Sequence, residues 1–272
     1  MDHAELLKLM ERKCAEILKS PGGNYWVTGE NKWAKLGGAP IAPSKYTGGI
    51  YVEQRELKEE FVKCAVAFEM GGWRCEDFAP CCALQQLLGG GSSFSAGGPG
   101  KGMYTRLYRE VLNRYAWVES SEAFINCHND VGLLGIDGAC KAESVGSMIQ
   151  VFIDHLLALT VELVKDEELS RAKNMLKSML FMQLESRLIT CEDIARQVMV
   201  FGERRDAGSL TAAIDNVTAH DLQRIAVKLF ENDPAVSIIG YDVSGAPSYS
   251  AIKRFTDSYK IEISKKLLNT HM

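Results

Sequence analysis

Apolar residues recur every three or four positions in several segments of the chain, which is the spacing of an amphipathic helix. The first of these segments covers residues 2–19, where Leu6, Met10 and Leu18 share one face, and it ends at Ser20-Pro21-Gly22-Gly23. The same spacing predicts three further helices, over residues 77–88, 103–114 and 145–159. Three more are predicted to begin at residues whose side chains can cap a helix: Asp166, Thr190 and Thr218.

Alternating apolar and polar residues mark the strands. In residues 61–69, Val62, Val66 and Phe68 fall on one face, as expected for a strand with one buried side. Alternation also predicts a strand pair over 117–126 and 131–139, joined near Asn129-Asp130, and a final strand over 236–241 followed by a polar tail. Helices and strands in this order predict an α+β fold with a mostly antiparallel sheet packed with helices, preceded by one orphan helix.

A glycine-rich loop separates the helices predicted at 77–88 and 103–114. Seven of the chain's 24 glycines fall within residues 89–102. The loop has few side chains to pack into a core, and glycine reaches backbone conformations closed to other residues. We therefore take the whole loop as the candidate substrate-binding site: Gly89, Gly90, Gly91, Ser92, Ser93, Phe94, Ser95, Ala96, Gly97, Gly98, Pro99, Gly100, Lys101 and Gly102.

The loop admits two other interpretations, a nucleotide-binding loop and a disordered linker. A phosphate-binding loop needs a glycine five positions before the Gly-Lys pair and a Ser or Thr after it, but Ser95 and Gly102 occupy those positions. No register yields the dinucleotide fingerprint either, so the spacing disfavours nucleotide binding. A disordered linker is the remaining alternative, and the periodic segments on both sides leave little polar sequence for a spacer.

Composition narrows the class of protein. A chain of 272 residues with 46% apolar residues can bury a sizeable core. No stretch reaches the ~18 uncharged apolar residues of a membrane helix. A net charge of −4 with no long basic run argues against nucleic acid as a partner. Asp2 and Glu5 are atypical of an import signal. Eight cysteines scattered over predicted helices and strands indicate reduced thiols rather than a disulfide framework.

The candidate chemistry of the side chains is sparse. No two of the five histidines lie within four residues of each other, so the chain lacks the His-x-x-Glu-His zinc motif. Cysteines near His128 match no zinc spacing, and packing accounts for them better than metal binding. No Gly-x-Ser-x-Gly elbow occurs, and His155 lies beside an apolar stripe. We expect no catalytic residue, no metal and no cofactor in this chain.

Residues Ser93 through Tyr108 closely resemble the glycine-rich loop of the alpha subunits of mitochondrial processing peptidases. Those subunits belong to the pitrilysin-like zinc peptidases and are homologous to cytochrome bc1 core proteins. The resemblance extends along most of the chain, in order, through 46–49, 111–115, 184–187 and 192–197. Ser92 departs from it, since the family usually has a fourth glycine there.

The resemblance implies one half of a two-half architecture. It assigns residues 1–20 to the last helix of a first half lying outside this chain, 21–48 to a linker, 49–255 to the second-half α+β domain and 256–272 to a C-terminal tail. The first half is then either cut away or made as a separate polypeptide. In both cases the apolar face of residues 2–19 is expected to be exposed until a partner covers it.

The same resemblance implies a function. Alpha subunits recognise presequences of imported precursors and do not cut, whereas a beta subunit carries zinc and cleaves. Presequences are basic, so acids in the cavity would attract them, while Lys101, Arg106, Arg109 and Arg114 are expected to face solvent or an interface. The expected location is the mitochondrial matrix. The alternative is a core subunit of the cytochrome bc1 complex, with cytochrome bc1 subunits as partners, on the matrix face of the inner membrane. A third interpretation is a chain with zinc peptidase activity of its own, but the sequence lacks the His-x-x-Glu-His motif which that activity requires.

Overall fold

The computed structural model describes residues 3–19, 44–56, 58–92 and 103–258. Its centre is a six-stranded sheet in the order β1-β6-β2-β5-β4-β3. Every neighbouring pair is antiparallel except β1 with β6, which is parallel. The strands are β1 Gly49–Gln54, β2 Phe61–Gly71, β3 Gly90–Ser92, β4 Val118–Cys127, β5 Val131–Lys141 and β6 Ala235–Gly240. The predicted mostly antiparallel α+β fold is confirmed.

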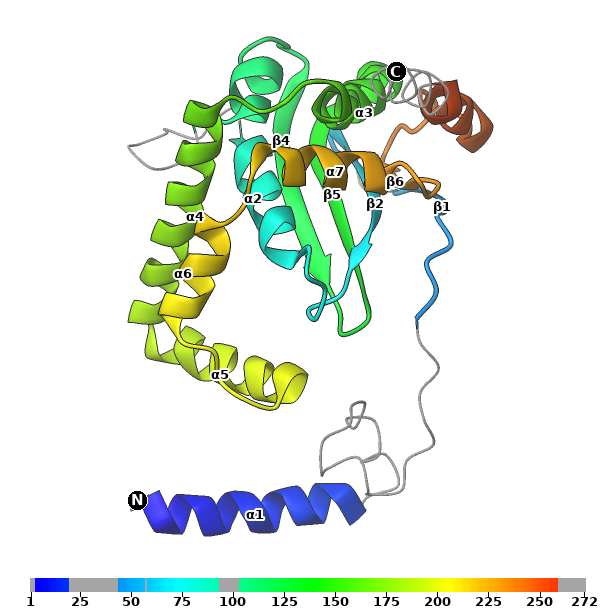
Figure 1. The fold of residues 1–272 in the computed structure, drawn as a ribbon. Helices are drawn as coiled ribbons and strands as arrows, with labels where there is room; N and C mark the ends of the chain where they lie inside the picture. The colour runs from blue at the N-terminus through cyan, green and yellow to red at the C-terminus, as the bar shows by residue number, and fades with distance from the viewer. Residues whose placement is uncertain (1–2, 20–43, 57, 93–102, 259–272) are drawn as a thin grey trace.

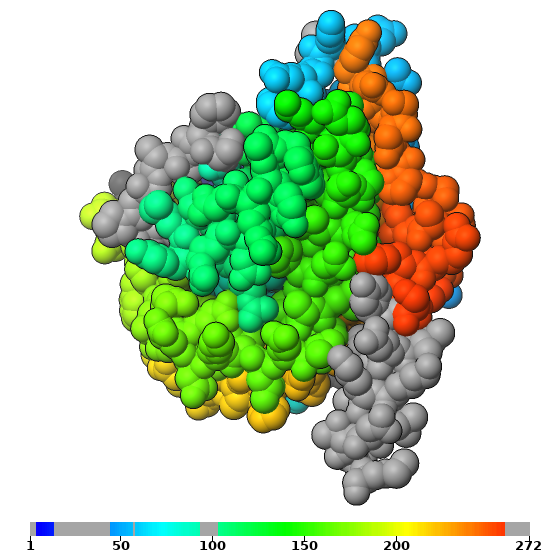
Figure 2. Space-filling model, turned by 90° about the horizontal axis from the view of Figure 1, so that it is seen from above, coloured from blue at the N-terminus to red at the C-terminus, as the bar shows by residue number. Residues whose placement is uncertain are grey.

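In the view of Figure 1, helices α2 and α7 pass in front of the strands of the sheet. A second group, α4, α5 and α6, forms an arm at one side of the sheet. The helices with assigned bounds are α1 His3–Lys19, α2 Phe78–Leu88, α3 Val145–Val161, α4 Asp166–Glu185, α5 Arg187–Phe201, α6 Ala207–Asp215 and α7 Ala219–Leu229. Residues 249–258 are also helical, and Figure 2 shows them in orange-red, packed on the domain.

The hydrophobic core fills the space between the sheet and the helices α2, α3 and α7. Phe68 of β2, Ile136 of β5 and Phe152 of α3 are completely buried there. Alternation explains why the strands contribute every second residue: one face of each strand meets the helices and the other does not. The core therefore lies on one face of the sheet, and the opposite face has no helix packed into this cluster among the described residues.

One segment of the described chain, Ala142–Val161, is long and apolar enough to cross a membrane by length and composition alone. Nine residues of its helix, α3, are buried, and the helix packs against β2, β5 and α7. Burial in the core thus accounts for the apolarity of α3.

Several predicted helix starts are corrected by the structure. The segment predicted as a helix over 103–114 has helical turns only over 106–112, and Tyr108–Leu112 forms a π-helix. Asp166 is the first residue of α4 and makes no capping bond. Thr190 lies inside α5, where its hydroxyl donates to the Leu184 carbonyl. Thr218 does begin α7, with a full capping box to Asp221.

A helix lies near each end of the chain. Helix α1 forms as predicted, and its Leu6, Leu7 and Met10 are exposed. Most of the predicted linker, residues 20–43, lies outside the described residues. At the other end, the segment expected to be a polar tail after β6 begins with the helix of residues 249–258, in which Thr256 is fully buried. The helix thus runs past residue 255, where the sequence placed the end of the domain.

The seven described cysteines are free thiols, as the sequence predicts. Two of them, Cys81 and Cys82 in α2, have pKa values raised to about 12 by burial. A thiol with such a pKa stays protonated at neutral pH and is a poor nucleophile and metal ligand. Cys81 lies in the hydrophobic core and Cys82 packs against it.

Candidate functional site

The candidate loop is described only at its beginning. Gly89, Gly90, Gly91 and Ser92 belong to the described structure, whereas Ser93, Phe94, Ser95, Ala96, Gly97, Gly98, Pro99, Gly100, Lys101 and Gly102 lie outside it. The description resumes at Met103. What the structure contributes is therefore the pair of anchors between which the loop runs.

The first anchor is the end of α2. The Gly89 N–H donates to the Gln85 carbonyl at 2.7 Å, and the chain then leaves the helix with a φ of 56° at Gly89. A side chain on Gly89 would clash with Thr105, because a Cβ there would lie 2.3 Å from the Thr105 methyl carbon. Glycine is required here both for the backbone turn and for the close approach of residue 105.

The residues after Gly89 form strand β3 at the edge of the sheet, a strand the sequence missed. Gly90 lies opposite Glu122 and Ser92 opposite Ser120 in the antiparallel pair with β4. The Gly89 carbonyl also accepts from the Ala123 N–H at 2.8 Å. The start of the candidate loop is thus held by the sheet and continues from its edge.

The second anchor is Thr105, just after the loop. The Gly90 N–H donates to Thr105 Oγ1 at 3.1 Å, and Thr105 is only 5% exposed. The two ends of the loop meet at this contact, since Ser92 and Met103 each lie two residues away from it along the chain. Thr105 therefore closes the base of the loop.

We predict that Thr105→Val destabilises the purified chain by about 1–3 kcal/mol, because Val keeps the shape of Thr but leaves the Gly90 N–H without its acceptor. Thr105→Ser keeps the hydroxyl and loses one methyl group, so it should cost only about 0.8 kcal/mol. Urea denaturation of both variants measures the difference. If Ser costs as much as Val, packing and not the hydrogen bond holds the loop base.

A largely buried ion pair fixes the segment after Thr105. The Arg106 guanidinium donates to both carboxylate oxygens of Glu168 in α4, at 2.7 and 2.9 Å. Burial opposes the charge on Arg106, but the hydrogen bonds and charge of Glu168 outweigh it and raise the pKa of the guanidinium. The expectation that Arg106 faces solvent or an interface is wrong: the pair ties the loop's second end to the helical arm.

The π-helix that follows packs on β3 and β4, and its Glu110 reaches His155 of α3. Leu107 and Val111 are fully buried, and Glu110 Oε2 lies 3.7 Å from His155 Nδ1. Burial lowers the pKa of His155, and the nearby Glu110 carboxylate partly opposes this. His155 is thus a largely buried residue of α3.

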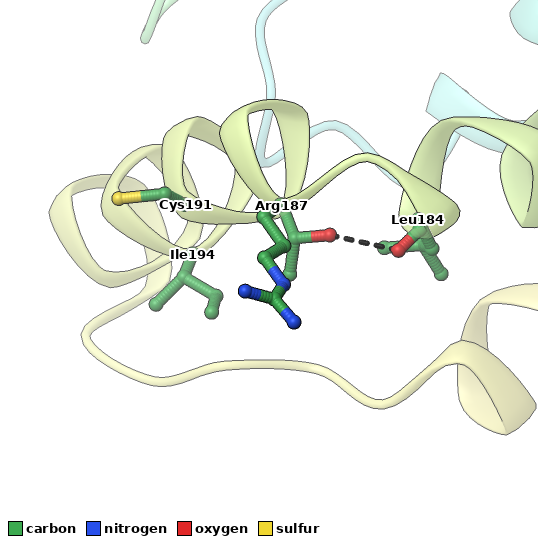
Figure 3. Close-up of a pocket in the computed structure, with 5 residues that line it drawn as sticks. Leu184, Arg187, Cys191 and Ile194 are labelled. Atoms are coloured by element: carbon green, nitrogen blue, oxygen red, sulfur yellow. Dashed lines mark hydrogen bonds between the residues drawn. The ribbon is translucent and has the colours of Figure 1, made fainter.

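A separate pocket of about 370 Å³ lies on the arm where α4 meets α5 (Figure 3). It is lined by Leu184, Arg187, Thr190, Cys191 and Ile194. Its one hydroxyl is already bonded to the Leu184 carbonyl at 2.9 Å. One guanidinium, one thiol and two apolar side chains form no set of groups that could carry out a reaction, so the pocket does not compete with the loop as the candidate site.

Over residues 3–19, 44–56, 58–92 and 103–258, no three His, Cys, Asp or Glu side chains gather closely enough to hold a metal ion. What this region offers is a loop base made of backbone groups, glycines and one threonine.

Comparison with known proteins agrees with the resemblance drawn from the sequence. The alpha subunit of the mitochondrial processing peptidase from Solanum tuberosum is 40% identical over 210 residues, which cover 76% of this chain and 41% of that subunit. The human alpha subunit is 37% identical over 221 residues, covering 77% of this chain and 41% of its own length. The chain thus spans about half the length of the curated relatives it matches.

A solved structure shares the fold. A chain of "Complex III2 from Candida albicans, Inz-5 bound" superposes with a TM-score of 0.71 at 17% identity, over 80% of this chain and 52% of that one. At that identity the likeness concerns the fold alone. Residues 1–176, more than half of the sequence, match the family described as the peptidase M16 inactive domain. The chain therefore belongs to the peptidase M16 inactive-domain family, with mitochondrial-processing peptidase alpha subunits among its relatives.

Proposed function

We propose that this chain is the substrate-recognition part of a non-catalytic alpha-type subunit of the mitochondrial processing peptidase. The observation that carries this proposal is the glycine-rich loop, closed at its base by the Gly90–Thr105 hydrogen bond and continuous with an edge strand. Backbone N–H and C=O groups can bind an extended polypeptide without demanding one sequence. A receptor for many different presequences needs that tolerance.

The same proposal places the cutting in another subunit. The family is described as inactive, and the sequence has no His-x-x-Glu-His motif. We infer a beta-type partner that holds zinc with two histidines and uses a glutamate as base. The working location is then the mitochondrion, on the matrix side, and the ligands are basic presequences.

The composition of the native complex and its zinc-dependent activity test this proposal together. Affinity isolation of the chain followed by mass spectrometry should recover a subunit with the His-x-x-Glu-His motif. The isolated complex should cleave a presequence-bearing precursor and lose that activity with a chelator. A complex without such a subunit, or without cleavage, contradicts the proposal.

The same isolation distinguishes the alternative role as a core subunit of the cytochrome bc1 complex. Recovery of cytochrome b and cytochrome c1 with the chain would support that role, and cleavage by the whole assembly would then show whether both roles coexist. The fold likeness to a complex III chain does not favour either role, because it rests on 17% identity.

A further inference from the structure

Among the described residues, one face of the sheet has no helix packed on it, and its edge strand β3 begins at Gly90. Position 138 of β5 points toward α3, because a Cβ on Gly138 would lie 2.9 Å from the terminal methyl carbon of Met148. Its neighbour Asp137 therefore points to the opposite face, since side chains alternate along a strand. On β4, Ala123 belongs to the core, so Glu122 also faces away from the helices. We call this side of the sheet the helix-free face.

Strand pairing arranges six residues of this face in one row across the whole sheet. The row starts at the loop edge and ends at the far edge: Gly90, Glu122, Asp137, Ala65, Ser237 and Tyr51. The neighbouring row also has small residues at its centre, Ala67 and Gly135. Both of these are buried, whereas Ala65 and Ser237 of the first row are partly exposed, so an extended polypeptide lying against the sheet would pass over these two small side chains.

Two carboxylates face each other within this row. Glu122 and Asp137 are directly paired across β4 and β5, and both are exposed. Among the described residues, neither forms an ion pair with a Lys or Arg, although Lys63 lies in the next row. Although Asp137 is exposed as a residue, partial desolvation of its carboxylate and then the charge of Glu122 raise its pKa. Like charges directly opposite each other in a sheet cost stability, and a bound cationic side chain would remove that cost.

We propose that the helix-free face docks an extended basic segment of the substrate polypeptide, with one Arg or Lys side chain held between Glu122 and Asp137. The charge of the pair selects a basic occupant, and the continuity of the row with Gly90 selects a polypeptide already held by the loop. This inference rests on the proposed function, because it assumes that the loop receives presequences. It identifies acids in this chain that meet the positive charge of the substrate.

The test uses the complete complex with its partner subunit and a fluorescein-labelled synthetic presequence peptide, followed by fluorescence anisotropy. A peptide series replaces each arginine in turn with citrulline, which has nearly the same shape and no charge. The E122Q/D137N double variant should bind the parent peptide about three- to tenfold more weakly. One citrulline peptide should bind the wild-type and the double variant equally. The matched control E203Q removes an exposed acid at the end of α5 and should change nothing.

The outcomes separate this inference from the proposed function. If E122Q/D137N binds every peptide as the wild type does, or weakens all of them equally, the docking site is wrong. A third variant, with residues 93–102 replaced by Gly-Ser-Gly-Ser, tests the loop itself: unchanged affinity of this variant would overturn the proposed function instead. The Tm of E122Q/D137N should be equal to or above that of the wild type, because repulsion is removed. A lower Tm would overturn the description of the carboxylates as a repelling pair.

Discussion

Replacing residues 93–102 with Gly-Ser-Gly-Ser is expected to reduce precursor cleavage by the complete peptidase about a hundredfold. Under the proposed function the loop binds an extended polypeptide through its backbone groups, and three lost hydrogen bonds at about 1 kcal/mol each correspond to this factor. The fold should survive, because Ser92 and Met103 each lie two residues from the Gly90–Thr105 contact and a short spacer can join them. Cleavage assays on a presequence-bearing precursor measure the effect.

The structure decides where this replacement must begin. Removing the whole predicted site from Gly89 onward would also take away the end of α2 and strand β3, so a loss of activity could not be assigned to recognition. Hydrolysis of a short peptide without a presequence is the control, since under the proposed function it reports on the zinc site of the beta-type partner. Loss of both activities, or retention of precursor cleavage, would contradict the recognition role of the loop.

Gly90→Ala is expected to lower the free energy of unfolding by roughly 2–6 kcal/mol, a large part of the 5–15 kcal/mol typical of a domain. Gly90 has a φ of 117°, and a Cβ there would lie 2.0 Å from the Ser121 carbonyl oxygen, inside the pair of β3 with β4. Strand β3 would have to leave the sheet. Urea denaturation measures the loss.

The matched control is Gly49→Ala. Gly49 has a similar φ of 125°, but a Cβ there would meet nothing within 4 Å. The control thus carries the backbone strain alone, roughly 1–3 kcal/mol. Equal losses for the two variants would show that strain, and not the contact with β4, makes glycine necessary at position 90.

The sequence predicts a helix or strand best when one face of that element packs against the core. Strands β2, β4 and β5 follow from alternation, because each places every second residue against the helices. Strand β3 could not be recognised this way, since its glycines have no side chains to alternate. The helix start proposed at Thr190 fails because the chain already turns helical at Arg187, and Ser186 precedes it as the N-cap residue.

For the candidate site, the sequence located the loop but not what holds it. Nothing in the sequence around Thr105 distinguishes it from other threonines. Its role depends on the hydrogen bond from the Gly90 N–H, which forms only when β3 lies beside it in the fold. The pairing of Glu122 with Asp137, in contrast, can be predicted from the sequence. A hairpin centred near Asn129-Asp130 brings residues 122 and 137 opposite each other, as the structure has them. Which face they occupy then follows from the apolar neighbours Ala123 and Ile136.

The order of strands has a mechanical consequence. The chain joins the sheet through β1 at one edge, whereas the loop leaves from β3 at the other. Five strand spacings of ~4.8 Å separate these edges by about 24 Å. If a hydrogen-bonded sheet with a packed core moves as a rigid body, a rotation of about ten degrees around β1 displaces the start of the loop by about 4 Å. The start of the candidate loop thus lies at the edge of the sheet where a rotation about β1 produces the largest displacement.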